Sequence, residues 1–175
     1  MRVIMSHEDL VLLLSILRDK QIDTRTNVLQ YEEPFLTVPD AIAAQVQAIT
    51  GAPNWRVLGA QTTLRKYAST ARAAKETGGI SVLGAAIPTD AQARLQLSEI
   101  HSHSQANPAD TVYLKKSDGA FVSLNHGQVH QVALAIARHT HACAAAEASA
   151  VAGVLSGTID SAAQIDAIFT QVSQG

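Results

Sequence analysis

Hydrophobic residues recur every three or four positions along most of this chain, a spacing typical of helices with one buried face. The first such run, Leu10–Leu17, is apolar on nearly all sides and follows Ser6 and Asp9, an S-x-x-D pattern that resembles a capping box. It predicts a helix that ends near Asp19 and is buried on more than one face, within the chain or against another subunit. The run is far shorter than the ~18 apolar residues that a membrane span needs, so we expect no span. Its acidic flank differs from the basic flank of a signal peptide, so we expect no targeting segment either.

The following residues predict short strands and a second helix. Val28–Tyr31 and Pro34–Val38 each have the length and the β-branched or aromatic content of a short strand. Pro39 suits the first turn of a helix, where its missing N–H costs nothing, and Gly51 ends that helix. The positions that we expect this helix to bury are Ile42, Val46 and Ile49.

Between residues 60 and 104 the pattern predicts two more helices with a hairpin between them. The segment Ala60–Lys75, rich in Ala and Arg, predicts the third helix, which stops at Gly78-Gly79. Gly84 then divides two short apolar runs, as in a β-hairpin. Thr89 and Gln92 form a T-x-x-Q capping box that starts the fourth helix. The expected core contacts of the fourth helix are Leu95, Leu97 and Ile100.

The segment Thr111–Ile136 is the most informative, because it combines a hairpin, a helix cap and an amphipathic helix. Asp118-Gly119 supplies the positive φ angles of a tight turn between two strands. Asn125 and Gln128 form the two halves of a capping box at the start of a long helix. A short helix, Ser161–Gln171, follows it. The expected buried positions of these two helices are Val129, Val132, Ile136, Thr140 and Cys143 in the long one, and Ile165, Ile168 and Val172 in the short one.

Together these elements predict an α+β fold that is predominantly α-helical, with one or two short β-hairpins. Its last long helix covers Asn125–Val154 and is followed by the short helix. The pattern becomes denser and more regular after Ala52–Gly59. We therefore expect two domains: an N-terminal attachment or oligomerisation unit, residues 1–58, and a helix-rich domain with the hairpins, residues 59–175.

Composition and charge limit the functions that fit this fold. Hydrophobic residues make up 47% of the chain and aromatic residues only 4%, so we expect a core of small aliphatic side chains and closely packed helices. The formal net charge of −2 gives no electrostatic reason to expect nucleic-acid binding. Cys143 is the only cysteine, which excludes an intramolecular disulfide. We interpret it as a small buried side chain. A catalytic thiolate is the alternative, but no neighbour in the sequence is arranged to lower its pKa.

Histidine is the only potential metal ligand present in unusual number, at seven. His126 and His130 share one helix face at i, i+4, but no Glu lies between them as in a zinc-protease motif, so we interpret them as a polar face. The pairs His101-Ser102-His103 and His139-Thr140-His141 point about 200° apart if they lie on helices. If the helix that starts near Ala91 broke before His101, three copies of an extended His101–His103 segment around a threefold axis could hold an octahedral metal. This alternative stays open.

No other pattern of catalytic residues is evident in the sequence. There is no G-x-S-x-G elbow, and Gly78–Ser81 lacks the Lys-Ser/Thr of a phosphate loop. Glu32-Glu33 and Glu99 are isolated carboxylates that we expect to be solvated. Trp55 most simply packs the two domains together. We therefore predict that the protein is not an enzyme and has no catalytic, cofactor-binding or metal-binding residues.

Several weak motifs follow one another in an order that resembles a known family. They are an Arg- and Ala-rich helix, a Gly-rich hairpin, a Thr-Asp helix start, a Lys-bearing strand with an Asp-centred turn, a Phe-Val-Ser-Leu strand and an Ile-Asp-x-Ala helix. In this chain they occupy Thr62–Lys75, Gly78–Ile87, Thr89-Asp90, Lys115–Gly119, Phe121–Leu124 and Ile159–Ile168. The stretch 64–169 resembles an uncharacterised C-terminal domain family of tailed-phage tail-fibre and tail-fibre-assembly proteins. Leu114 stands where that family often has a Trp.

The resemblance implies a setting more than an activity. It implies a structural component of a tailed bacteriophage virion, a tail-fibre or baseplate-associated protein that acts as an adaptor or attachment element in host adsorption. A tail-fibre assembly chaperone that is not retained in the mature particle is the alternative. Either role implies other phage tail, fibre or baseplate proteins as partners, and symmetric tail parts favour a homotrimer. The expected location is the virion, after synthesis in the bacterial host cytoplasm. An enzyme acting on cell-surface sugar or peptide would need a carboxylate pair or a metal site.

Overall fold

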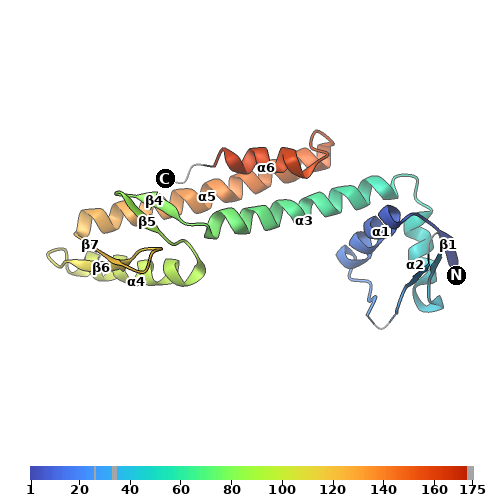
Figure 1. Ribbon diagram of the computed structural model, residues 1–175, viewed down its shortest axis with the longest axis horizontal. Helices are drawn as coiled ribbons and strands as arrows, with labels where there is room; N and C mark the ends of the chain where they lie inside the picture. Colours follow the sequence, from blue (N-terminus) through green and yellow to red (C-terminus); the bar gives the residue numbers. More distant parts are fainter. Residues whose placement is uncertain (26, 33–34, 173–175) are drawn as a thin grey trace. The chain divides into compact units, whose positions relative to one another are not determined.

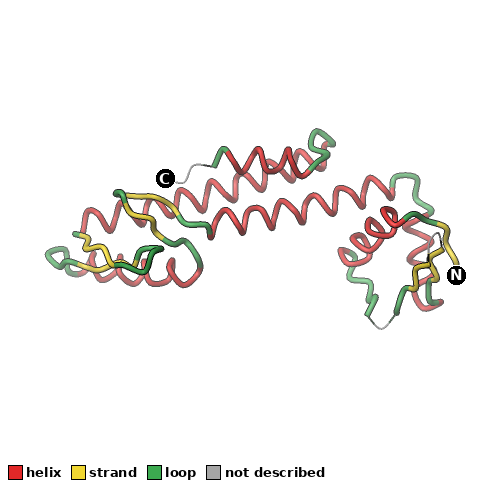
Figure 2. The backbone as a smooth tube through the Cα atoms, in the orientation of Figure 1, coloured by secondary structure: helices red, strands yellow, loops and turns green. Residues whose placement is uncertain are grey.

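The computed structural model describes residues 1–25, 27–32 and 35–172, and in this part of the chain it contains six helices and seven short strands (Figure 1). The strands form antiparallel pairs only, as a three-stranded sheet and two hairpins, and helices make up most of the chain (Figure 2). The predicted α+β, mainly helical fold is therefore confirmed. None of the helices in the described ranges combines the length and the hydrophobicity that a membrane span requires.

The chain divides into two compact units. The first unit contains Met1–Tyr67 and Val154–Asp160, and the second contains Ala68–Gly153 and Ser161–Gly175. Each unit has its own hydrophobic core. The division falls inside two helices, between Tyr67 and Ala68 and between Gly153 and Val154. The expected domain boundary between residues 58 and 59 stays a prediction.

The first unit begins with a small antiparallel sheet in the order β1-β3-β2. These strands are β1, Arg2–Ile4; β2, Gln30–Glu32; and β3, Phe35–Thr37. The two strands predicted in this region fall on β2 and β3, whereas β1 was missed because a strand of three residues leaves almost no alternation to detect. Pro34, the expected start of the second strand, lies outside the described residues.

Helix α1, His7–Asp19, starts as predicted, because the Ser6 hydroxyl accepts the Asp9 N–H at 3.1 Å. The four side chains that it buries are Leu10, Leu13, Ile16 and Leu17. The Asp9 carboxylate is bound at both oxygens by the Arg56 guanidinium, at 2.6 and 2.9 Å. This fork-to-fork ion pair ties α1 to the helix that carries Arg56.

Helices α2, Asp40–Thr50, and α3, Trp55–Thr77, differ from the prediction at their N-termini. Pro39 is the N-cap of α2 and not a first-turn residue, since its ψ of 145° is extended. The α3 helix starts five residues before the expected Ala60, because Trp55 is 7% exposed and anchors the first turn in the core. The buried stripe of α2 is confirmed as Ile42, Val46 and Ile49.

The second unit contains a hairpin that leads into α4. Strands β4, Ile80–Val82, and β5, Ala85–Ile87, are joined by Leu83 and Gly84, whose φ angles of 54° and 73° define a type I′ turn. Helix α4, Ala91–Ala106, is capped by Asp90, which accepts the N–H groups of Gln92 and Ala93. The prediction of Thr89 as the cap is wrong by one residue, because the Thr89 side chain turns inward. The expected burial of Leu95 is also wrong: it is 63% exposed, since Leu97, two positions later on the opposite side of the helix, faces the core.

The β6–β7 hairpin and the long helix match the prediction more closely. Strands β6, Val112–Lys115, and β7, Phe121–Leu124, enclose a turn in which Gly119 has a φ of 85°. Asp118, which was expected to share the positive φ, does not. The Lys116 N–H donates to the Ala120 carbonyl at 2.8 Å, so the loop proper is the three residues 117–119, with glycine at the left-handed position.

Helix α5, His126–Ser156, opens with the predicted reciprocal box and ends before Gly157, which has a φ of 77°. The Gln128 N–H donates to Asn125 Oδ1 at 3.0 Å, and the Asn125 N–H donates to Gln128 Oε1 at 2.9 Å. Thr140 is only partly buried, because the neighbouring His139 takes the inward position.

Helix α6, Ala162–Thr170, runs back along α5 (Figure 1). The Ser161 N–H and hydroxyl both donate to Gln164 Oε1. Ile165 and Val172 are buried as predicted, but Phe169 takes the third core position and the expected Ile168 is only partly buried.

Candidate functional site

Thr89 is a buried cross-link between the end of α3 and the start of α4. Its side chain is completely buried. The hydroxyl accepts the Gly79 N–H at 2.9 Å and donates to the Glu76 carbonyl at 2.6 Å. The residue that the sequence indicated as a helix cap therefore fixes the chain between two helices.

Glu76 is the centre of a charged network that joins three helices. It is 7% exposed, and its carboxylate pairs with Arg72, one turn earlier on α3, and with Arg94 on α4. Arg72 Nε also lies 2.7 Å from a carboxylate oxygen of Glu147 on α5. Sequence reasoning missed this network. The only local signal for it was the i, i+4 spacing of Arg72 and Glu76.

His139 and Cys143 fill the space between α5 and the end of α3. His139 is 3% exposed, and its Nε2 lies 3.1 Å from the Lys75 carbonyl, so this nitrogen carries the proton and donates. Cys143 Sγ lies 3.7 Å from the same nitrogen. Burial raises the pKa of the Cys143 thiol above its usual range, and the negative charge of Glu76 raises it further. A raised pKa disfavours the thiolate, so the environment supports a packing role.

Four histidines, two on α4 and two on α5, each contact a residue of another segment. His126 Nδ1 lies 2.9 Å from the Ser104 carbonyl and 3.0 Å from its hydroxyl. His103 Nε2 lies 3.1 Å from the Asp110 carboxylate. His101 Nε2 lies 3.5 Å from His130 Nδ1 on α5, and the two rings stack at 28°.

These positions change two sequence interpretations. Helix α4 continues through Ala106, so the His101–His103 segment is helical and the extended arrangement needed for a threefold metal site is absent here. His126 and His130, interpreted as one polar face, each contact α4 instead of each other. His139 and His141 do lie on different sides of α5, the first buried and the second exposed.

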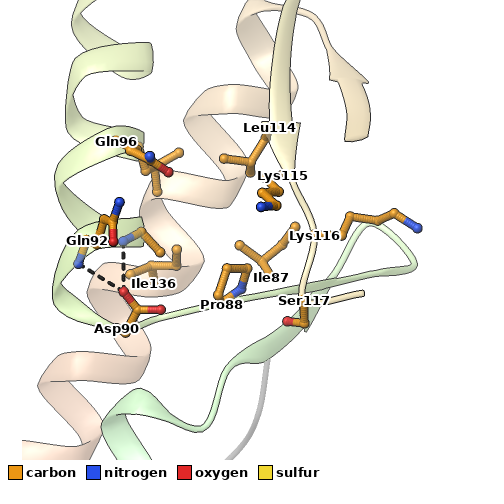
Figure 3. Close-up of a pocket in the computed structure, with 12 residues that line it drawn as sticks. Ile87, Pro88, Asp90, Gln92, Gln96, Leu114, Lys115, Lys116, Ser117 and Ile136 are labelled. Carbon is orange, nitrogen blue, oxygen red and sulfur yellow. Dashed lines mark hydrogen bonds between the residues drawn. The ribbon is translucent and has the colours of Figure 1, made fainter. Parts of the chain in front are cut away.

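A cavity of about 270 Å³ lies between α4 and the two hairpins of the second unit (Figure 3). Apolar side chains form much of its walls, among them Ile87, Leu97, Leu114 and Ile136. Gln92 and Gln96 supply polar groups, whereas the Asp90 carboxylate is directed to the first turn of α4 as its cap. The volume is just below that of typical sites for drug-sized ligands, so it suits a small solute or a single inserted side chain.

The remaining candidates from the sequence take different places in the structure. Gly79 donates its N–H to Thr89, and Glu32 and Glu99 are exposed. Glu33 lies outside the described residues. Trp55 belongs to the first core, and its expected role in joining the two domains stays a prediction. Within the described ranges, no three His, Cys, Asp or Glu side chains are grouped so that they could hold a metal ion.

These features define a mainly helical domain whose buried polar side chains connect its elements. Residues 59–169, more than half of the chain, match the family model described as "Domain of unknown function (DUF4376)", and the chain belongs to this family. The match carries no function with it. Comparisons with curated proteins and with solved structures found no match.

Proposed function

We propose that this protein is a structural part of a bacteriophage tail, a fibre- or baseplate-associated adaptor that joins other tail proteins during host adsorption. The resemblance of residues 64–169 to tail-fibre and tail-fibre-assembly proteins supplies the setting. One observation supports a role other than catalysis: buried polar side chains of the second unit bond its elements to one another. Glu76, Thr89 and His139 are all bonded to other elements of the second unit, which suits a rigid part better than a reaction centre.

The outward face of the β6–β7 hairpin supports a role in binding other proteins. Tyr113 and Phe121 are 65% and 66% exposed. Lys115 is the cross-strand partner of Phe121 and lies two residues from Tyr113, so all three side chains share one face. Exposed aromatic side chains are enriched in protein interfaces. We propose other tail, fibre or baseplate proteins as the partners, with the chain itself as a homotrimer.

The test is the composition of purified particles. The full chain carries an affinity tag during infection by its phage, and mass spectrometry then measures the protein in purified virions. Recovery at a fixed stoichiometry supports the structural role. Absence from virions, with recovery alongside fibre proteins from infected cells, indicates the assembly chaperone instead. Association with neither refutes the proposal.

A pair of variants connects this test to the hairpin. Replacing both Tyr113 and Phe121 by serine should abolish recovery with tail proteins while the circular dichroism spectrum stays unchanged. The matched control is Leu95→Ser, since Leu95 is equally exposed but lies on α4. Equal recovery of both variants would show that this face is not used. Light scattering of the purified protein tests the trimer directly.

A further inference from the structure

His101 and His130 bring two imidazole nitrogens together across two helices. His101 Nε2 and His130 Nδ1 are 3.5 Å apart, and the ring centroids are 5.7 Å apart. His101 is partly exposed and His130 is exposed, so solvent and ions reach the pair. Each side chain is carried by a helix of at least sixteen residues, so both rings are attached to regular backbone.

This spacing fits a shared metal ion. A metal ion would bind both nitrogens in their unprotonated form, at a position beside the line that joins them. A metal about 2.05 Å from each nitrogen, the usual zinc–imidazole distance, gives an N–metal–N angle of about 117° when the nitrogens are 3.5 Å apart. That angle is close to the tetrahedral arrangement that zinc prefers.

The neighbouring histidines do not share this geometry. His126 is bonded through Nδ1 to Ser104, and His103 faces Asp110. His141 is exposed on α5. The described residues place only imidazoles 101 and 130 within reach of one ion, so the site supplies two protein ligands and leaves further positions for water or for a group from a binding partner.

We propose that His101 and His130 form a two-ligand site for a divalent transition-metal ion, with a nitrogen spacing that suits zinc and with nickel or copper as substitutes. Imidazole is a ligand that suits all three metals. The inference is independent of the proposed tail function, because metal binding is measured on the isolated full chain.

The test is isothermal titration of the full chain with zinc chloride and nickel chloride, with magnesium chloride as the hard-cation control. We expect one zinc ion per chain at this site and no magnesium binding. His101→Gln and His130→Gln should each weaken zinc binding by about tenfold or more, a loss of about 1.4 kcal/mol per factor of ten. The matched control, His141→Gln, changes an exposed histidine of the same helix as His130 and should leave the affinity unchanged.

Two further results separate chelation from independent binding to single histidines. The double variant His101→Gln/His130→Gln should bind no more weakly than either single variant, because either change alone destroys the shared site. Nuclear magnetic resonance of the ring nitrogens should show both imidazoles shifting together as zinc is added. The proposal is overturned if the single variants bind zinc as tightly as the unmodified chain, if their losses add independently, or if His141→Gln causes the same loss.

Discussion

Replacing Thr89 by valine tests the cross-link between α3 and α4 with almost no change in side-chain volume. The variant keeps the shape of the side chain but leaves the Glu76 carbonyl and the Gly79 N–H without the hydroxyl that both now contact. A buried polar group left unsatisfied costs about 1–3 kcal/mol. The Glu76 bond is buried and the Gly79 bond is partly buried, so we expect the free energy of unfolding to fall by about 2–4 kcal/mol in total.

Thr89→Ser is the matched variant. It keeps the hydroxyl and loses one buried methyl group, which should cost about 0.8 kcal/mol from the lost burial alone. Serine should therefore be tolerated better than valine. Reasoning from hydrophobic burial alone predicts the opposite order, so the ranking of the two variants is decisive.

The assay is urea unfolding followed by far-ultraviolet circular dichroism, with free energies from linear extrapolation. Amide hydrogen exchange gives a local readout, since the Gly79 N–H should exchange faster in the valine variant and stay protected in the serine variant. A valine variant as stable as the unmodified chain, or more stable than the serine variant, would refute the assigned role of the hydroxyl.

Three further predictions address other parts of the fold. Gly119→Val should destabilise the protein more than Gly119→Asn. A Cβ at this position would meet no atom within 4 Å, so the difference reports only the backbone φ of 85°, and urea unfolding measures it. Leu124→Asp should unfold the second unit by placing an unpaired charge at a site that is 3% exposed, whereas Leu124→Met should fold, as judged by circular dichroism. The pKa of Asp9 is held below its usual range, chiefly by its hydrogen bond from Arg56. The resulting stabilisation is present above the ordinary carboxyl pKa of about 3.9 and is lost as the pH falls through the lower folded value. We therefore expect Asp9→Asn to lack this pH-dependent part of the stability in thermal melts recorded from neutral to strongly acidic pH. An unchanged pH profile would contradict the assignment.

Local chemistry explains which elements were predictable from the sequence. The caps at Ser6 and Asn125 and the turn at Gly84 depend on residues within three positions of one another, so their signals are readable along the chain. The two strands of the β6–β7 hairpin were readable for the same reason, because Gly119 marks the turn between them.

Tertiary contacts explain the errors. Thr89 and Asp90 are both good capping residues, and only the distant Gly79 N–H and Glu76 carbonyl decide that Thr89 turns inward. Trp55 starts α3 early because it packs into a core formed by segments far away in the sequence. No local pattern contains that information.

The candidate sites were less predictable than the fold. The sequence drew attention to histidine pairs two or four residues apart, but the pair that meets, His101 and His130, is separated by 29 positions. Glu76 is recognisable in the sequence only as the i, i+4 partner of Arg72, whereas its second partner, Arg94, lies on another helix. Such groupings follow from the packing of α3, α4 and α5, which sequence spacing alone does not specify.

The single tryptophan and the single cysteine lie in different compact units, both buried. Tryptophan emission at Trp55 therefore follows the opening of the first unit, whereas the rate at which Cys143 reacts with an aromatic disulfide reagent follows the opening of the second. The chain thus carries one native reporter for each half and needs no added label. Recording both signals through one denaturant series would show whether the two halves melt as one cooperative body or in separate steps.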